Sequence, residues 1–199
     1  MGIGVIERAL HWRERLRTRL FTWLIASQFR EIGSGSRISP PFRFWGLHQI
    51  SIGEMVMVHQ FSWIQAIGDE GSNEAAKIII KSHARIGMGA HISAVRQIVI
   101  GEHVMLGRNV YISDHLHGYK DTTTLIANQG IDDIKPVSIG RGSWLGNNVA
   151  VLPGASIGEH CVIGVNSVVS TPVPDFSVAV GMPARVVRNL RPNSAKTEI

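Results

Sequence analysis

The most constraining feature of this sequence is a row of aliphatic residues that recur at intervals of six. The row comprises Ile139, Leu145, Val151, Ile157, Ile163 and Val169. Two positions before each of them stands a small or short side chain, namely Val137, Ser143, Val149, Ala155, Cys161 and Ser167. An α-helix repeats about every 3.6 residues and a strand every two, so neither explains a strict period of six. A solenoid does, in which each hexad is one short strand plus a corner and three hexads close a triangular turn.

Earlier parts of the chain carry the same period with interruptions. Aliphatic residues at six-residue steps are Ile52, Val58 and Ile64, then Ile80, Ile86, Ile92 and Ile98, then Ile100, Leu106 and Ile112. A polar segment, residues 68–76, separates the first two sets. The ladder stops again after Ile112 and resumes at Ile139, an interval that is not a multiple of six. The sequence therefore predicts an all-β fold, a parallel β-helix that starts near Ile38 and extrudes a loop after Ser113.

An amphipathic helix is expected before the solenoid, over residues 5–31. Its apolar residues recur at steps of three and four: Val5, Ala9, Trp12, Leu16, Leu20, Trp23 and Leu24. The opposite face is mostly arginine. Such a stripe packs on the solenoid or on a neighbouring subunit; the alternative is a helix that lies on the inner leaflet of a membrane, with arginine toward anionic headgroups. We expect three parts: residues 1–36 as helix and linker, 37–175 as the β-helix, and 176–199 as a closing segment and tail.

Composition narrows the classes of partner and the compartment. The chain has 199 residues, of which 44% are hydrophobic and 18% charged, as is ordinary for one folded domain. Its formal charge is +5, but no DNA- or RNA-binding motif accompanies it, so nucleic acid is not an expected partner. The single cysteine, Cys161, rules out an internal disulfide and is expected to be a buried spacer. No secretory signal is visible, so we expect a cytoplasmic protein, peripheral on the inner membrane if the helix binds lipid.

The loop that interrupts the ladder contains the residues best suited to chemistry. It reads Ser113-Asp-His-Leu-His-Gly-Tyr119, and loops on a rigid scaffold commonly carry binding and catalytic groups. His115 and His117 flank Leu116, which hexad counting turns inward, so both imidazoles are expected to face outward. An imidazole can serve as a general base, and Asp114 is near enough to orient one of the two rings. The alternative is a solvent-exposed pair that makes only turn hydrogen bonds.

Three segments of the chain resemble one family of enzymes. They are Asn109–Tyr119, Pro136–Ala155 and Gly181–Arg188, the last similar to a Gly-x-Pro-Ala-Arg closing motif. From about Ile80 to Leu190 the chain resembles the hexapeptide-repeat acyltransferases, especially the galactoside and maltose O-acetyltransferases and those of lipopolysaccharide and capsular polysaccharide assembly. The resemblance implies a left-handed parallel β-helix, acetyl-CoA as co-substrate, a carbohydrate acceptor and a homotrimer.

The resemblance also assigns roles to individual residues. The catalytic histidine falls on His117, with His115 as the second candidate and Asp114 as the group that fixes the tautomer. The positions that match contacts to acetyl-CoA are Trp144 beside the pantetheine arm, the backbone amides of Asn147 and Val165, and Arg185 and Arg188 near the phosphates. For Trp144 the alternative is a surface aromatic side chain of the solenoid. Thr171 departs from the pattern, because relatives often have lysine there.

A metal site is the rival interpretation of the histidines. Zinc sites of the γ-carbonic anhydrase type carry a His-x-x-x-x-His spacing followed by Gly-Cys. This chain lacks that spacing, so no metal is expected.

The expected function is transfer of an acetyl group from acetyl-CoA to a hydroxyl of a sugar or polysaccharide precursor, without an acyl-enzyme. The alternatives are an N-acetyltransferase of an amino sugar, another acyl-CoA transferase, or a non-enzymatic β-helix scaffold. The sequence does not specify the sugar, the hydroxyl, the acyl length or whether the acceptor is lipid-linked.

Overall fold

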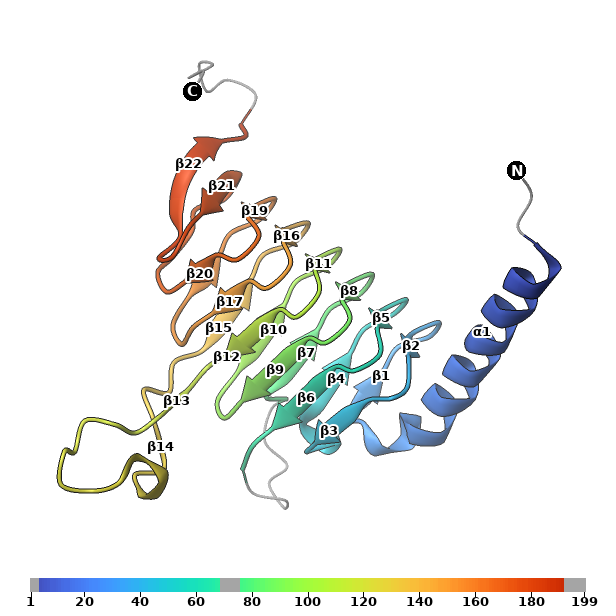
Figure 1. Ribbon diagram of the computed structural model, residues 1–199, viewed down its shortest axis with the longest axis horizontal. Coiled ribbons are helices and arrows are strands. Elements are labelled where there is room, and N and C mark those ends of the chain that lie inside the picture. The colour runs from blue at the N-terminus through green and yellow to red at the C-terminus, as the bar shows by residue number, and fades with distance from the viewer. Residues whose placement is uncertain (1–3, 69–75, 192–199) are drawn as a thin grey trace.

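A computed structural model describes residues 4–68 and 76–191 of the chain. Figure 1 shows a column of short strands stacked coil upon coil, with one helix beside its first coils and a hairpin at the opposite end. Successive coils contribute strands to three sheets, here called faces A, B and C, within which the coils pair in parallel. Most of the polar segment expected at residues 68–76 lies outside the described residues.

The strands of the three faces are short, as a chain that turns a corner every six residues requires. Face A consists of β1 (Glu31–Ile32), β4 (Ile50–Ile52), β7 (Ile78–Ile80), β10 (Ile98–Ile100), β15 (Val137–Ile139) and β18 (Ser156–Ile157). Face B consists of β2 (Arg37–Ile38), β5 (Met57–Val58), β8 (Arg85–Ile86), β11 (Met105–Leu106), β16 (Trp144–Leu145), β19 (Val162–Ile163), β21 (Ser177–Val180) and β22 (Arg185–Asn189). Face C consists of β3 (Arg43–Trp45), β6 (Trp63–Ala66), β9 (His91–Ala94), β12 (Tyr111–Ser113), β17 (Ala150–Val151) and β20 (Val168–Val169).

The predicted hexad ladder forms the core. On face A, Ile80 pairs with Ile100, Ile100 with Ile139 and Ile139 with Ile157, so equivalent aliphatic side chains stack inside the column. All of the ladder aliphatics are buried, and so are the six small residues two positions before the last six of them. Cys161 is one of these spacers and is 1% exposed. The parallel β-helix predicted from the period of six is thus confirmed.

The corners explain the glycine and asparagine of the repeat. A Cβ on Gly140 would collide with the backbone of Gly158 in the next coil, so no larger residue fits where the coils stack. Asn109, Asn148 and Asn166 occupy equivalent turns at positive φ, a conformation that asparagine tolerates. Their side chains form a ladder, with bonds of 3.2 Å from Asn109 to Asn148 and 3.0 Å from Asn148 to Asn166. These turns connect face B to face C.

The N-terminal helix is shorter than expected and its orientation differs from the first expectation. Helix α1 spans Val5–Ile25 and continues into a 3-10 turn, η1 (Ala26–Gln28). The side turned to the β-helix carries Thr18, Thr22 and Ile25, and the Thr22 hydroxyl accepts the N–H of Ile38 at 2.8 Å. The predicted apolar stripe therefore does not pack on the solenoid of its own chain. Its side chains Val5, Trp12, Leu16, Leu20, Trp23 and Leu24 are all exposed.

The β-helix also extends beyond both expected boundaries. Strand β1 begins at Glu31 and pairs with β4, so the first coil starts inside the segment expected to be a linker. At the other end, β21 continues face B past residue 175, pairing in parallel with β19. Strand β22 then returns antiparallel to β21 and closes the column. Among the described residues, no helix has the length and apolar character needed to cross a bilayer.

Candidate functional site

The extruded loop begins with a carboxylate–imidazole pair that the fold holds in place. Asp114 follows directly on β12, and its Oδ1 lies 2.9 Å from Nδ1 of His115. The side chain of Asp114 is fully buried, whereas that of His115 is 11% exposed. Because a carboxylate only accepts hydrogen bonds, it fixes the proton of neutral His115 on Nδ1. The ring nitrogen left for a substrate is Nε2, which has no partner among the described residues.

The preceding coil holds Asp114 from a second side. Its Oδ1 accepts the N–H of Val95 at 2.8 Å, and its Oδ2 accepts those of Arg96 and Gln97, each at 2.7 Å. Burial raises the pKa of the Asp114 carboxyl, but the hydrogen bonds from His115 and the three N–H groups outweigh it. The pKa therefore lies below its ordinary value of 3.8. The carboxylate is ionised near neutral pH and orients the imidazole.

The backbone around His115 is fixed as well. The buried hydroxyl of Ser113 donates to the His115 carbonyl at 2.7 Å. Where the extruded loop returns to the column, the N–H of Lys135 donates to the carbonyl of Asp114 at 2.8 Å. An imidazole held this firmly, with one ring nitrogen unpaired, has the arrangement that a general base requires.

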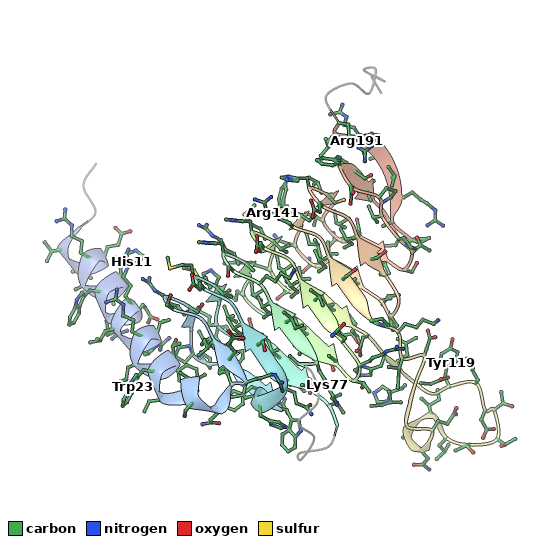
Figure 2. All side chains as sticks on the ribbon, turned by 180° about the vertical axis from the view of Figure 1, so that it is seen from behind. His11, Trp23, Lys77, Tyr119, Arg141 and Arg191 are labelled. Atoms are coloured by element: carbon green, nitrogen blue, oxygen red, sulfur yellow. The ribbon has the colours of Figure 1, made fainter. Side chains whose placement is uncertain are left out.

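His117 lies in a different environment. It belongs to β13 (Leu116–His117), which pairs antiparallel with β14 (Ile131–Asp132) in the extruded loop. Its side chain is exposed, and within the described ranges it forms no hydrogen bond or ion pair. Leu116 is half-buried in this hairpin, outside the column, so the expectation from hexad counting that it turns inward is wrong. The fold thus brings Asp114 to His115 rather than to His117. Figure 2 shows the loop projecting from the column, with Tyr119 near its base.

The sequence reasoning missed a row of side chains on the outside of face C. The ring of His91 stacks on Trp63, with centroids 4.4 Å apart, and meets Tyr111 edge-on at 5.3 Å. Burial, and after it the charges of His115 and Arg43, lower the pKa of His91, so this ring stays neutral near pH 7. Parallel pairing aligns Trp63, His91 and Tyr111 across three coils. The signal in the sequence is the equivalent position of these three rings in successive coils.

The residues matched to acetyl-CoA contacts gather on another side of the column. Trp144 is on β16 and is 49% exposed; Asn147 and Val165 lie in the turns after β16 and β19; Arg185 and Arg188 are exposed on β22. The N–H groups of Asn147 and Val165 have no hydrogen-bond partner within the part of the chain that the structure describes. Unpaired N–H groups on an exposed edge can donate to the carbonyl oxygens of an extended ligand.

Face B is also hollowed along its earlier coils. A groove of about 450 Å³ runs along it, and its lining includes Arg37, Arg85, His83 and Met105. The lining ends at Met105, which pairs with Trp144 of the next coil. Its basic and thioether side chains suit a long ligand that carries phosphates.

The two groups of residues do not meet within one chain. His115 and its carboxylate lie at the corner between faces C and A, because Asp114 binds the turn that joins β9 to β10. Trp144 lies on face B, which is opposite that corner in a three-sided column. One chain therefore presents the candidate base and the candidate CoA surface on opposite sides.

Metal ligation finds no support in the described part of the chain. Residues 4–68 and 76–191 contain no group of three or more His, Cys, Asp or Glu side chains arranged to hold an ion.

Known proteins with similar sequence and structure are acyltransferases by name. Residues 136–171 match the family described as bacterial transferase hexapeptide (six repeats). The chain is 39% identical over 144 residues to a probable acetyltransferase of Mycobacterium tuberculosis, covering 72% of this chain and 45% of that protein. It is 32% identical over 117 residues to WbbJ of Escherichia coli, a candidate lipopolysaccharide biosynthesis O-acetyl transferase, covering 56% of this chain and 60% of WbbJ. The chain spans about half the length of these curated relatives.

Among solved structures, the fold is similar to that of a variant of AntD, an N-acyltransferase from Bacillus cereus crystallised with dTDP and coenzyme A. The TM-score is 0.72 at 18% identity, over 85% of this chain and 89% of AntD. At 18% sequence identity, this similarity shows that the two proteins share a fold. The chain therefore has a left-handed β-helix fold, and its residues 136–171 carry the hexapeptide repeat of bacterial transferases.

Proposed function

We propose that the protein transfers an acetyl group from acetyl-CoA to a hydroxyl group of a sugar or polysaccharide precursor. The observation that carries this proposal is the pair formed by buried, ionised Asp114 and His115. The names of the relatives support the reaction class, since one is a probable acetyltransferase and the other a candidate O-acetyl transferase.

His115 is the general base in this proposal, and His117, the first candidate from the sequence, becomes the alternative. Nε2 of neutral His115 takes the proton of the acceptor hydroxyl as its oxygen attacks the thioester carbonyl. A new carbon–oxygen ester bond forms, the carbon–sulfur bond breaks, and the CoA thiolate receives the proton. A backbone N–H, such as that of Asn147, stabilises the oxyanion. Because both substrates are aligned in one cleft, no acyl-enzyme is needed.

The same proposal requires more than one copy of the chain. Trp144, Asn147, Val165, Arg185 and Arg188 bind the CoA part of the donor. Trp144, Arg185 and Arg188 lie on face B, opposite the His115 corner, and Asn147 and Val165 lie at the corner between faces B and C. A closed homotrimer brings face B of one copy to the His115 corner of the next. The proposal includes a cytoplasmic location, which an unpaired cysteine such as Cys161 suits.

N-acylation of an amino sugar is the second candidate function, supported by the fold likeness to AntD. The two functions differ in what the base must do. A sugar hydroxyl needs its proton removed as it attacks, whereas an amine present in its free form attacks with its own lone pair. The positioned Asp114–His115 pair favours the hydroxyl acceptor.

The test is an acetyl-transfer assay in which CoA release is followed with a thiol reagent and products are identified by mass spectrometry. The acceptors are a panel of neutral sugars, amino sugars and their nucleotide-linked forms. We expect O-acetylated product, and a rate reduced roughly 10²–10⁴-fold in His115→Ala but little changed in His117→Ala. N-acetylated product alone would establish the second function. Loss of activity in His117→Ala with a normal rate in His115→Ala would move the base to His117.

A further inference from the structure

We propose that helix α1 docks the protein on an anionic membrane surface, with the apolar side of the helix in the lipid boundary. The proposal concerns a surface that the acetyl-transfer chemistry does not use, and it stands independently of that chemistry.

The first observation is the direction of the apolar stripe. Residues two positions apart lie on nearly opposite sides of an α-helix. Thr18 and Thr22 face the β-helix, so Leu20, between them, faces away. The same relation turns Leu16 away from the side of Thr18, and Trp23 away from the side of Ile25. The stripe is thus directed outward, and Figure 2 shows Trp23 on the side of α1 remote from the strands.

The second observation is the exposure of this stripe. Val5 is 84% exposed, Trp23 73%, Trp12 67% and Leu20 55%. An exposed apolar stripe of this length is unusual on a soluble surface and marks a contact with another apolar phase. Tryptophan and leucine beside arginine are the composition of helices that lie in the membrane interface.

The third observation is the charge at the edges of the stripe, which decides between lipid and a second copy of the chain. At 100° per residue, Arg19 borders one edge of the stripe, with Arg15 about 40° beyond it toward the β-helix, and Arg13 lies at the other edge between Leu20 and Leu24. The acidic residues of the helix do not face them, because Glu7 pairs with His11 and Glu14 with Arg17. A second copy of the helix would bring arginine against arginine. Anionic headgroups complement the same charges, and the long arginine side chains reach them from the edges.

Docking in this manner would set the orientation of the whole column. The C-terminal half of α1 is bound to the first coils through Thr18, Thr22 and Ile25. In Figure 1 the helix lies along one end of the column, with the extruded loop and β22 pointing elsewhere. The site around His115 therefore stays accessible while the helix lies on lipid.

The test is flotation of the full chain with vesicles of phosphatidylcholine alone or of a one-to-one mixture with phosphatidylglycerol. We expect binding to the mixed vesicles that weakens as salt is added. Replacing the three arginines together (Arg13→Gln, Arg15→Gln and Arg19→Gln) should lower the partition coefficient roughly 100-fold. The double variant Trp12→Ser and Trp23→Ser should lower it about 10-fold or more. Matched controls are Trp45→Ser, an exposed tryptophan on β3, and Arg141→Gln, an exposed arginine in the turn before β16; both should bind as the parent does.

Light scattering and acetyl-CoA titration on the same variants separate the alternatives. The proposal is overturned if the parent does not bind mixed vesicles, or if the tryptophan variant binds them equally well. It is also overturned if the parent does not bind vesicles and the tryptophan variant forms a smaller oligomer than the parent by light scattering. The stripe is then a contact between copies of the chain. Retained acetyl-CoA binding in any of these outcomes would leave the proposed function intact, since the helix and the CoA surface are separate.

Discussion

The carboxylate of Asp114 binds the imidazole of His115 and the backbone of the preceding coil at the same time. It lies 2.9 Å from Nδ1 of His115 and at the same time accepts three consecutive backbone N–H groups of the preceding coil. The orientation of the candidate base therefore depends on the scaffold itself. In the proposed function, Asp114 acts through His115 and is a positioning residue.

Replacing Asp114 by Asn should leave the column folded but misplace the proton of His115. The amide offers N–H where the backbone N–H groups need an acceptor, and it no longer stabilises the imidazolium that forms during transfer. We expect kcat to fall roughly 10- to 1000-fold with an unchanged KM for acetyl-CoA. The control is Asp121→Asn in the exposed part of the loop, which should keep its rate. A fall in acetyl-CoA affinity with unchanged kcat would contradict the positioning role.

The same carboxylate should make stability depend on pH in the acid range. The pKa of Asp114 is lowered in the folded state from an unfolded value near 3.8, so its ionised form stabilises the fold. This contribution is complete above about pH 4 and is lost as the pH falls through the folded-state pKa. Urea unfolding should give a difference in free energy between the parent and Asp114→Asn that is constant from pH 7 to about pH 5 and shrinks below about pH 4. A difference that grows on acidification would have the wrong sign.

The Trp144 side chain is expected to contribute to donor binding by stacking. It stands exposed on β16 between Met105 and Val162, so its removal opens no core cavity. Trp144→Ala should weaken acetyl-CoA binding about 2- to 10-fold without changing the melting temperature. Trp144→Phe should keep most of the affinity. Equal affinity in the alanine variant would make Trp144 a surface aromatic residue only.

Cys161 should be chemically inert in the folded protein. Burial raises the pKa of its thiol, and its Sγ donates to the carbonyl of Pro174 at 3.0 Å. Iodoacetamide at pH 8 should leave Cys161 unmodified until denaturant is added, as mass spectrometry would show. Cys161→Ala should retain the transfer rate, as direct transfer requires. Complete loss of activity in a folded alanine variant would indicate an acyl-enzyme instead.

The column was predictable because its cause is local and repeated. Each hexad buries one aliphatic residue, so the six-residue spacing from Ile139 to Val169 directly indicates the repeat of the β-helix. The pairing of Asp114 with His115 rather than with His117 was not predictable, because the ladder count fails once the chain leaves the column after Ser113. The position of Asp114 depends on the turn at Val95–Gln97, far from the loop in sequence, whose N–H groups bind its carboxylate. The direction of α1 is likewise a tertiary effect, since Thr22 binds Ile38 and turns the apolar stripe outward.

Calorimetric titration of acetyl-CoA into the purified protein is the most direct test of donor binding. We expect micromolar binding that weakens about 10-fold in Arg185→Ala, since a charge-assisted contact to phosphate is lost. Arg141→Gln, a comparable exposed arginine outside the CoA surface, should bind like the parent. Absence of binding to acetyl-CoA and to longer acyl-CoA thioesters would contradict the account, and the β-helix would then need a different function.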